Sequence, residues 1–273
     1  MMEKSEVVLY LFCFARPEEA RQVAASSVDE RNPVRIFRHS AEVCAVIGEV
    51  AREDFCGPQA ERRMEQLSWV GPRALRHEAV IEEVMEHSPV LPARFGTLFS
   101  SLPALTQFMD AHHAAIAQFL GRVAGHREWS VQGRFDRNRA QQARMAEWLA
   151  AEQGQLSGLA EGTRYFAEKR IRHQAEQELG GWLAQTLRQV VGELARHASD
   201  CRECAPLARE RSDNESEEVL NWAFLLPESK AASFLQEVDR ANLEHARQGL
   251  QFESSGPWPP FRFVPALAAS DTP

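Results

Sequence analysis

The segment Ser254–Val264 (SSGPWPPFRFV), near the end of the chain, constrains the fold more than any other stretch. Three of the four residues at 257–260 are prolines, which fix φ near −65° and lack a backbone N–H, so the segment can be neither helix nor central strand. Apolar side chains alternate with polar ones on both sides of the prolines: Leu250, Phe252, Phe261 and Phe263. This pattern predicts a strand, a rigid corner carrying Trp258 at the edge of the core, and a second strand.

The composition is that of a globular protein of 273 residues, with 44% hydrophobic residues and a net charge of −8. The negative charge argues against nucleic acid or a lipid membrane as the main partner, because both present anionic surfaces. No apolar run approaches the roughly 20 residues of a membrane helix, and the acidic N-terminus is unlike a signal peptide. Five cysteines form an odd and sparse set for a disulfide scaffold. We therefore expect a cytoplasmic protein with reduced thiols.

Residues 1–125 predict an N-terminal domain of mixed helices and strands. The continuous apolar run Val7–Ala15 is typical of a strand buried on both faces. After Ser40, a candidate N-cap, apolar residues recur at helical spacing, so a helix is expected before Gly57. The remaining elements expected here are strands at 34–37 and 90–99, and helices at 59–69, at 75–87 after a break at Gly71-Pro72, and at 102–123.

Residues 126–273 predict a second domain. Trp129, Val131 and Phe135 alternate with polar residues, as in an antiparallel strand with one wet face. A long helical territory follows (137–200), then strands at 207–212 and 218–226, a helix after Ser229, and the strand that leads into the proline corner. This is the βαββαβ order of a ferredoxin-like sandwich with an enlarged first crossover. The fold class expected for the chain is therefore α+β with two domains, the boundary lying near Gly125.

Motifs for catalysis or metal binding are weak. His197, Cys201 and Cys204 have metal-ligand spacing, but three ligands make an incomplete structural zinc site. Glutamates recur along one helical pattern, which is typical of a solvated face: Glu78, Glu82, Glu83 and Glu86. Glycine-rich phosphate loops, a GxSxG elbow and an HExxH motif are all absent from the sequence. We predict no catalytic residue, no metal and no cofactor.

The tryptophans point instead to interaction surfaces. Six tryptophans are many for a chain with two tyrosines, and large aromatic residues often anchor interfaces. Trp182 and Trp222 lie within core patterns, whereas three others flank breaks or polar runs: Trp69, Trp148 and Trp258. These three are candidates for binding a partner.

Several stretches together resemble the gas vesicle protein F/L (GvpF/GvpL) family. The residues that carry the resemblance are Trp69 with His77-Glu78, Val90–Phe99 (VLPARFGTLF), Glu128–Val131 (EWSV), Gly162–Phe166 (GTRYF) and Gly256–Val264 (GPWPPFRFV). The chain departs from the family pattern at Gln132, where a lysine is expected, and at 201–215, which looks like a variable insertion.

The resemblance implies two modified ferredoxin-like domains with a long, coiled-coil-like helical portion in the second half. It implies a non-enzymatic role in gas vesicle assembly, with the hydrophobic shell protein and other accessory proteins as partners. A strongly apolar shell subunit needs such a partner before assembly. The candidate interaction residues are Trp69, Arg94, Phe95, Trp148, Trp258 and Phe261.

Two other interpretations compete with this one. A small-molecule enzyme would use a pocket near Arg94 and the His77/Glu78 pair, since arginine suits a carboxylate or phosphate ligand. For Arg94 itself we favour a structural role, in a buried ion pair. A metal-dependent regulator would instead use His197, Cys201 and Cys204.

Overall fold

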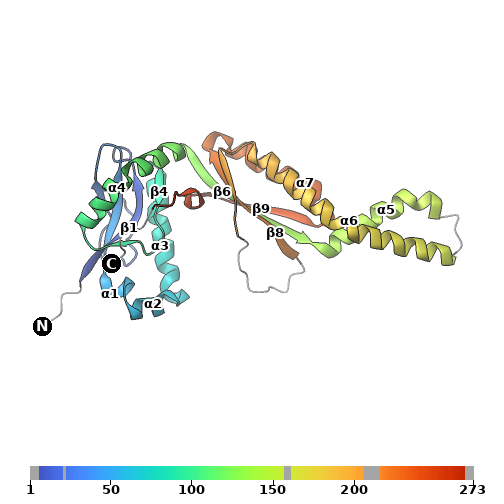
Figure 1. The fold of residues 1–273 in the computed structure, drawn as a ribbon, viewed down its shortest axis with the longest axis horizontal. Coiled ribbons are helices and arrows are strands. Elements are labelled where there is room, and N and C mark those ends of the chain that lie inside the picture. The colour runs from blue at the N-terminus through green and yellow to red at the C-terminus, as the bar shows by residue number, and fades with distance from the viewer. Residues whose placement is uncertain (1–5, 21–22, 157–160, 206–215, 268–273) are drawn as a thin grey trace. The chain divides into compact units, whose positions relative to one another are not determined.

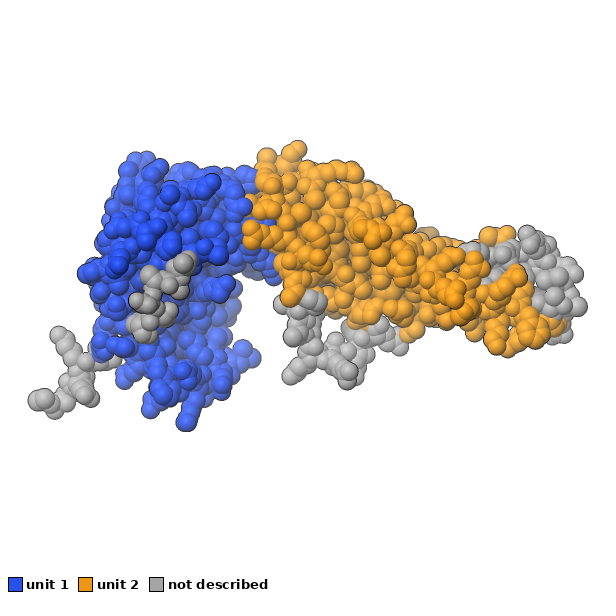
Figure 2. All heavy atoms as spheres, in the orientation of Figure 1, with its two compact units in different colours: residues 1–128, 257–273 blue, residues 129–256 orange. Residues whose placement is uncertain are grey.

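The structure is a computed structural model that describes residues 6–20, 23–156, 161–205 and 216–267. The chain divides into two compact units (Figure 2): unit 1 contains residues 1–128 and 257–273, and unit 2 contains residues 129–256. Residues 257–273 therefore group with unit 1, whereas the sequence-based division assigned them to the second domain.

Unit 1 is built on a sheet in the order β2-β3-β1-β4, with β5 pairing with β1 beside β4. β1 is antiparallel to β3, β4 and β5, and β2 is antiparallel to β3. The strands are β1 (Val7–Ala15), β2 (Arg35–Arg38), β3 (Cys44–Ala51), β4 (Val90–Pro92) and β5 (Leu98–Phe99). The helices are α1 (Arg52–Phe55), α2 (Pro58–Met64), α3 (Leu67–Met85) and α4 (Leu102–Val123).

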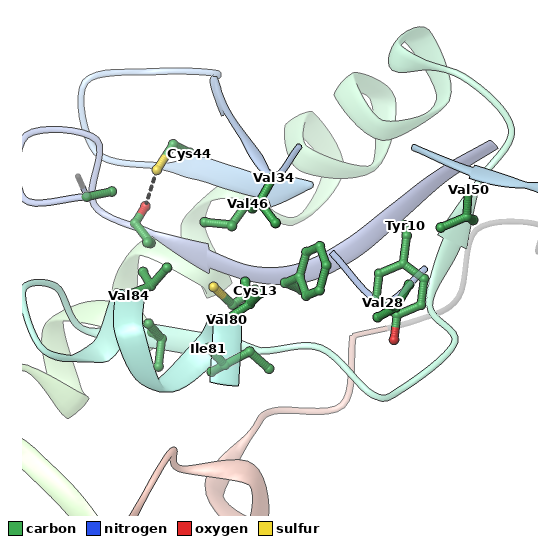
Figure 3. Packing of buried hydrophobic residues seen from close by; sticks show 14 of the residues in the cluster. Tyr10, Cys13, Val28, Val34, Cys44, Val46, Val50, Val80, Ile81 and Val84 are labelled. Carbon is green, nitrogen blue, oxygen red and sulfur yellow. Dashed lines mark hydrogen bonds between the residues drawn. The ribbon is translucent and has the colours of Figure 1, made fainter. Parts of the chain in front are cut away.

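The central strand β1 is buried because a helix packs on each of its faces, as its continuous apolar run predicts. On one face, Val80 and Ile81 of α3 pack with Tyr10 and Cys13 of β1 in the main core cluster (Figure 3). On the other face, the ring of Phe14 stacks on Phe108 of α4, with 6.2 Å between ring centroids. A register shift between Leu11 and Cys13 exchanges the residues that point to each face.

Unit 2 has a four-stranded sheet in the order β7-β8-β6-β9. Its elements are β6 (His126–Asp136), α5 (Arg137–Leu156), α6 (Glu161–Ala195), β7 (Asp200–Glu203), β8 (Ser216–Pro227), α7 (Ala231–His245) and β9 (Leu250–Trp258). One core cluster joins β6 to α6 and α7 through Phe135, Leu179, Val190 and Phe234. Short 3-10 helices occur at Glu228–Lys230 (η1), Ala246–Gln248 (η2) and Phe261–Phe263 (η3). The fold is thus a mixture of helices and two sheets (Figure 1).

The helix expected after Ser40 is wrong, because this stretch forms β3. Val43, Val46 and Val50 are fully buried, and a strand covered on both faces carries apolar residues at spacings that can mimic a helix. The Ser40 hydroxyl accepts hydrogen bonds from the backbone N–H groups of Glu42 (3.2 Å) and Val43 (3.1 Å). Ser40 therefore closes a turn that leads into the strand, by the same side-chain chemistry that would cap a helix.

Three other expectations also differ from the structure. α3 runs through Gly71-Pro72 without a break, since Pro72 near its start removes only one intrahelical hydrogen bond. The stretch 90–99 forms two short strands separated by a turn. After the proline corner, Phe261–Phe263 form a 3-10 turn instead of a second strand, whereas the strand expected before the corner is β9. The strand expected at 207–212 lies outside the described residues.

Candidate functional site: the Arg94 turn

The turn Ala93–Thr97 between β4 and β5, here called the Arg94 turn, is fixed at both ends by β1. The Ala93 N–H donates to the Phe12 carbonyl, and the Leu11 N–H donates to the Thr97 carbonyl, both at 2.9 Å. Within the turn, the Arg94 carbonyl accepts from the Thr97 N–H (3.1 Å) and from the Thr97 hydroxyl (2.7 Å). Gly96 has φ +81°, a conformation that glycine adopts at little cost. The backbone of the turn is therefore held in one conformation.

A buried pair, Tyr10 and His77, holds the same turn from inside the core. The Gly96 N–H donates to the Tyr10 hydroxyl oxygen (3.1 Å), and that hydroxyl lies 3.0 Å from Nδ1 of His77. Nε2 of His77 lies 3.1 Å from the Ala93 carbonyl oxygen, which can only accept. We therefore assign the His77 proton to Nε2, which leaves Nδ1 to accept from Tyr10. This neutral tautomer satisfies every group in the network.

Burial keeps both side chains neutral at pH 7. His77 is 2% exposed, and desolvation lowers its pKa from 6.5 to about 4, partly offset by the hydrogen bond to Ala93. Desolvation likewise raises the pKa of Tyr10 above its ordinary value, partly offset by the hydrogen bond from Gly96. The network therefore has a structural role and holds no proton that it could transfer near neutral pH.

The structure separates His77 from Glu78, the pair that the enzyme interpretation requires. His77 points into the core of unit 1, whereas Glu78, the next residue along α3, is exposed. Partial burial and the nearby Glu82 raise the pKa of the Glu78 carboxyl. Because consecutive helical residues point about 100° apart, these two side chains do not converge on one substrate.

Trp69 and Phe95, both predicted interaction residues, are half-buried in an aromatic cluster next to the Arg94 turn. The Phe95 ring lies 5.8 Å from the His77 ring at 87° and 6.1 Å from the Tyr10 ring. The Trp69 ring packs edge-on against Phe55, with 5.4 Å between centroids. Both residues pack against the core of unit 1. Their main contacts are thus internal, and both residues support the Arg94 turn from inside unit 1.

Arg94 lies at the exposed side of the turn. The structural role predicted for it, a buried ion pair, is wrong, because Arg94 is exposed and none of the described residues forms an ion pair with it. Sequence reasoning missed this because the strand expected at 90–99 gave Arg94 a place in a sheet. The turn instead presents a permanently charged, planar guanidinium on a fixed backbone.

The other predicted interaction residues lie elsewhere. Trp258, the last residue of β9, is 39% exposed, and Phe261 packs half-buried against the core of unit 1. The side chain of Trp148, on α5, lies outside the described residues.

Sequence reasoning also missed the anchor of the terminal segment. The carboxylate of Glu128, whose side chain is 2% exposed, accepts from the Arg262 N–H and from its guanidinium, both at 2.9 Å. Arg122 also donates to the Phe263 carbonyl at 2.8 Å. The only sequence signal for this anchor was that Glu128 and Arg262 both lie in stretches that carry the family resemblance.

The metal interpretation gains no support from the geometry. Nδ1 of His197 is hydrogen-bonded to the Ser233 hydroxyl at 3.2 Å, and the Cys204 thiol donates to the Arg202 carbonyl at 3.7 Å. Among the described residues, no group of three or more His, Cys, Asp or Glu side chains is placed to hold a metal ion. A search of the same residues finds no helix with the length and apolar character needed to cross a membrane.

Comparisons with known proteins converge on one family. The family described as "Gas vesicle synthesis protein GvpL/GvpF" matches residues 8–265. Gas vesicle protein L of Streptomyces sp. (strain CB03234) is 27% identical over 259 residues, which covers 93% of this chain and 92% of that protein. Gas vesicle protein L1 of Halobacterium salinarum is 23% identical over 276 residues, covering 94% and 90%.

Two crystal structures share the fold. GvpF from Anabaena sp. PCC7120 superposes with a TM-score of 0.67 at 18% identity, covering 97% of this chain and 99% of that one. GvpF from Microcystis aeruginosa gives a TM-score of 0.65 at 19% identity, covering 95% and 99%. At these identities the likeness establishes the arrangement of helices and strands.

Proposed function

Since the chain belongs to the gas vesicle synthesis protein GvpL/GvpF family, which takes part in gas vesicle formation, we propose that it is a non-enzymatic accessory protein of shell assembly. It binds the hydrophobic shell protein or other accessory proteins while the shell is being built. It works in the cytoplasm and in association with the vesicle. A chain with a net charge of −8 stays soluble while it holds an apolar partner.

The observation that carries a binding function is the way unit 1 holds the Arg94 turn. A buried, neutral network is fully used in fixing the turn, and the side chain that the turn presents is an exposed cation. Pre-organised backbone lowers the entropy that a binding residue loses when its partner docks. Such a site suits recognition of a carboxylate on a partner protein better than proton transfer.

The proposal gives the six candidate interaction residues different roles. Arg94 contacts the partner, and Trp69 and Phe95 keep the turn in place. Trp258 and Phe261 belong to a second contact region around the terminal segment, and Trp148 stays a predicted interaction residue.

We also propose that each unit is a modified ferredoxin-like sandwich. Numbered within each unit, both sheets have the strand order 2-3-1-4, and in each unit a helix connects the third strand to the fourth. The α5–α6 hairpin is the coiled-coil-like portion of the second unit.

Co-purification tests the proposed function. The tagged chain is expressed together with the shell protein and the other gas vesicle proteins, and the same cells are scored for vesicles with and without it. Capture of an identified gas vesicle protein, together with loss of vesicles when the chain is removed, is the expected result. Normal vesicles without the chain, and no captured gas vesicle protein, would overturn the proposal.

A further inference from the structure

Two adjacent aromatic side chains on α6 are unusually exposed. Tyr165 is 63% exposed and Phe166 is 70% exposed, and their rings contact each other edge-on with 5.7 Å between centroids. An exposed pair of large aromatic rings loses the free energy that burial would provide, roughly 25 cal/mol per Å² of apolar surface. Such pairs therefore mark surfaces that a partner covers.

Two cationic side chains and a histidine accompany this aromatic pair. Lys169 and Arg170 follow one turn later, His173 lies a further turn along, and all three are exposed. At about 100° per residue, the five side chains fall within an arc of about 140° on one side of the helix. We call Tyr165, Phe166, Lys169, Arg170 and His173 the α6 aromatic–basic face.

The described residues of unit 2 give this face one side-chain hydrogen bond, between His173 and Gln177 of the same helix (3.0 Å). α5 packs along α6, and the half-buried Ala167 lies about 130° around the helix from the centre of the aromatic–basic arc, outside that arc. Within the described part of the chain, Lys169 and Arg170 take part in no ion pair. Farther along the helix, by contrast, Glu193 pairs with Arg240 of α7. Among the described residues, the two rings contact each other and the two cations of the α6 aromatic–basic face have no ion-pair partner.

We propose that the α6 aromatic–basic face docks an acidic amphipathic helix of another gas vesicle protein. This inference rests on the proposed function. The face follows a straight helix for more than two turns, and the natural complement of such a surface is a second helix packed alongside. Apolar side chains of that helix cover the two aromatic rings. Its carboxylates pair with Lys169 and Arg170, which gives the contact register and salt sensitivity.

The charge pattern also favours an acidic helix over the other anionic partners, nucleic acid and lipid surfaces. Nucleic acid and lipid surfaces need extended basic patches, whereas Glu176 and Glu178 follow this face on the same helix and the whole chain is acidic. A short acidic helix meets the local cations and avoids the carboxylates beyond them. Tyrosine and arginine are also the residues that dominate binding energy in protein interfaces.

Capture of gas vesicle proteins by variants of the full tagged chain tests this proposal. One variant combines Tyr165→Ser with Phe166→Ser, and a second combines Lys169→Glu with Arg170→Glu. Matched controls are Leu243→Ser, which removes another exposed apolar side chain (85% exposed), and Arg188→Glu, which reverses an exposed charge elsewhere on α6. Each protein is co-expressed with the shell protein, and separately with each other gas vesicle protein, and folding is checked by circular dichroism.

The expected result is that both variants of the face capture at least about tenfold less of one identified gas vesicle protein, whereas both controls capture as much as the wild type. Raising the salt concentration should weaken capture by the wild type. Equal capture by wild type and face variants would overturn the docking site. Loss with the serine variant alone would overturn the acidic partner.

Three further outcomes also contradict the proposal. A dimer of the wild type that the serine variant abolishes would make a second copy of this chain the occupant. Binding to vesicles of phosphatidylglycerol that the glutamate variant abolishes would make it a lipid surface. If the wild type captures no gas vesicle protein at all, the proposed function fails together with the docking site. If the wild type captures one and the face variants capture it equally well, only the docking site fails.

Discussion

The two units share a strand order but differ in how they connect the first strand to the second. In unit 1 the connection from β1 to β2 (residues 16–34) contains no helix among its described residues, whereas in unit 2 the connection from β6 to β7 is the α5–α6 hairpin. The same sheet thus accepts a loop or a long helical insertion. In unit 2 the proposed contact surface lies on this inserted helix, whereas in unit 1 it lies on the Arg94 turn between β4 and β5.

The units also anchor their fourth strand in a similar way. In unit 1, His77 of α3 bonds to the backbone just after β4. In unit 2, Asn242 of α7 accepts from the Phe252 N–H (2.7 Å) and donates to the Phe252 carbonyl (2.9 Å) on β9. Each helix precedes the strand that it anchors. The His77 anchor is fully buried and belongs to the candidate site, whereas Asn242 is half-buried and satisfies the free side of an edge strand.

The largest expected loss of stability follows from substituting a glycine of unit 2. Gly249 has φ +77°, and a Cβ at this position would overlap the carbonyl oxygen of Asp136, so Gly249→Ala should cost more than about 3 kcal/mol of unfolding free energy. Gly57 of unit 1 has φ +88° with open space around it, so Gly57→Ala should cost about 1 kcal/mol. Urea unfolding measures both, and equal losses would contradict the close approach in unit 2.

The next effect is the pH dependence of unit 1. Below pH 6.5 the unfolded chain protonates His77, whereas folded His77 stays neutral until about pH 4. The unfolded state therefore binds more protons in this window. The contribution of His77 to the unfolding free energy should be constant above pH 6.5. It should fall by about 3 kcal/mol as the pH drops towards 4. In His77→Leu this contribution should vanish, and an unchanged pH profile would show that His77 is not buried as a neutral imidazole.

A smaller effect separates the two anchors. His77→Leu leaves the Ala93 carbonyl without its partner in the core, so it should cost about 2 kcal/mol at pH 7. Asn242→Leu exposes its strand groups to water and should cost about 1 kcal/mol. Urea unfolding at pH 7 distinguishes them. An Asn242 variant that loses more stability than the His77 variant would reverse the ranking of the two anchors.

The smallest effects on stability are expected at the contact surfaces. Arg94→Ala in unit 1 and Phe166→Ser in unit 2 should each change the unfolding free energy by less than about 0.5 kcal/mol, because both side chains are exposed. Thermal unfolding checks this. A marked loss of stability would give these residues a structural role and would remove the argument that they are available to a partner.

Patterns within single elements predicted much of the fold. The buried run of β1, the helix α4, the alternation of β6 and the strand that begins at Leu250 all followed from local periodicity. The prediction for the stretch after Ser40 failed because a strand buried on both faces lacks the alternation of apolar and polar residues that marks a strand. The turn within 90–99 was not predicted because a proline and short apolar runs do not distinguish one strand from two.

The candidate site was less predictable, since its key contacts join residues far apart in sequence. Tyr10 and His77 are separated by 67 residues, and only the fold shows that both hold the Arg94 turn. Trp69 and Phe95 were both predicted as interaction residues, but aromatic composition cannot distinguish a supporting cluster from a contact surface. Exposure of Arg94 likewise required the geometry of the turn.

The most direct test of the central claim compares Arg94→Ala with Arg38→Ala, an exposed arginine of β2 in the same unit. Capture of the shell protein and other gas vesicle proteins is measured for both full-length variants at matched stability, with Arg94→Lys as a third variant. We expect Arg94→Ala to lose capture of one identified protein by about tenfold or more, Arg94→Lys to restore part of it, and Arg38→Ala to behave as the wild type. Undiminished capture by Arg94→Ala would contradict the account, because the turn would then present its cation to no partner.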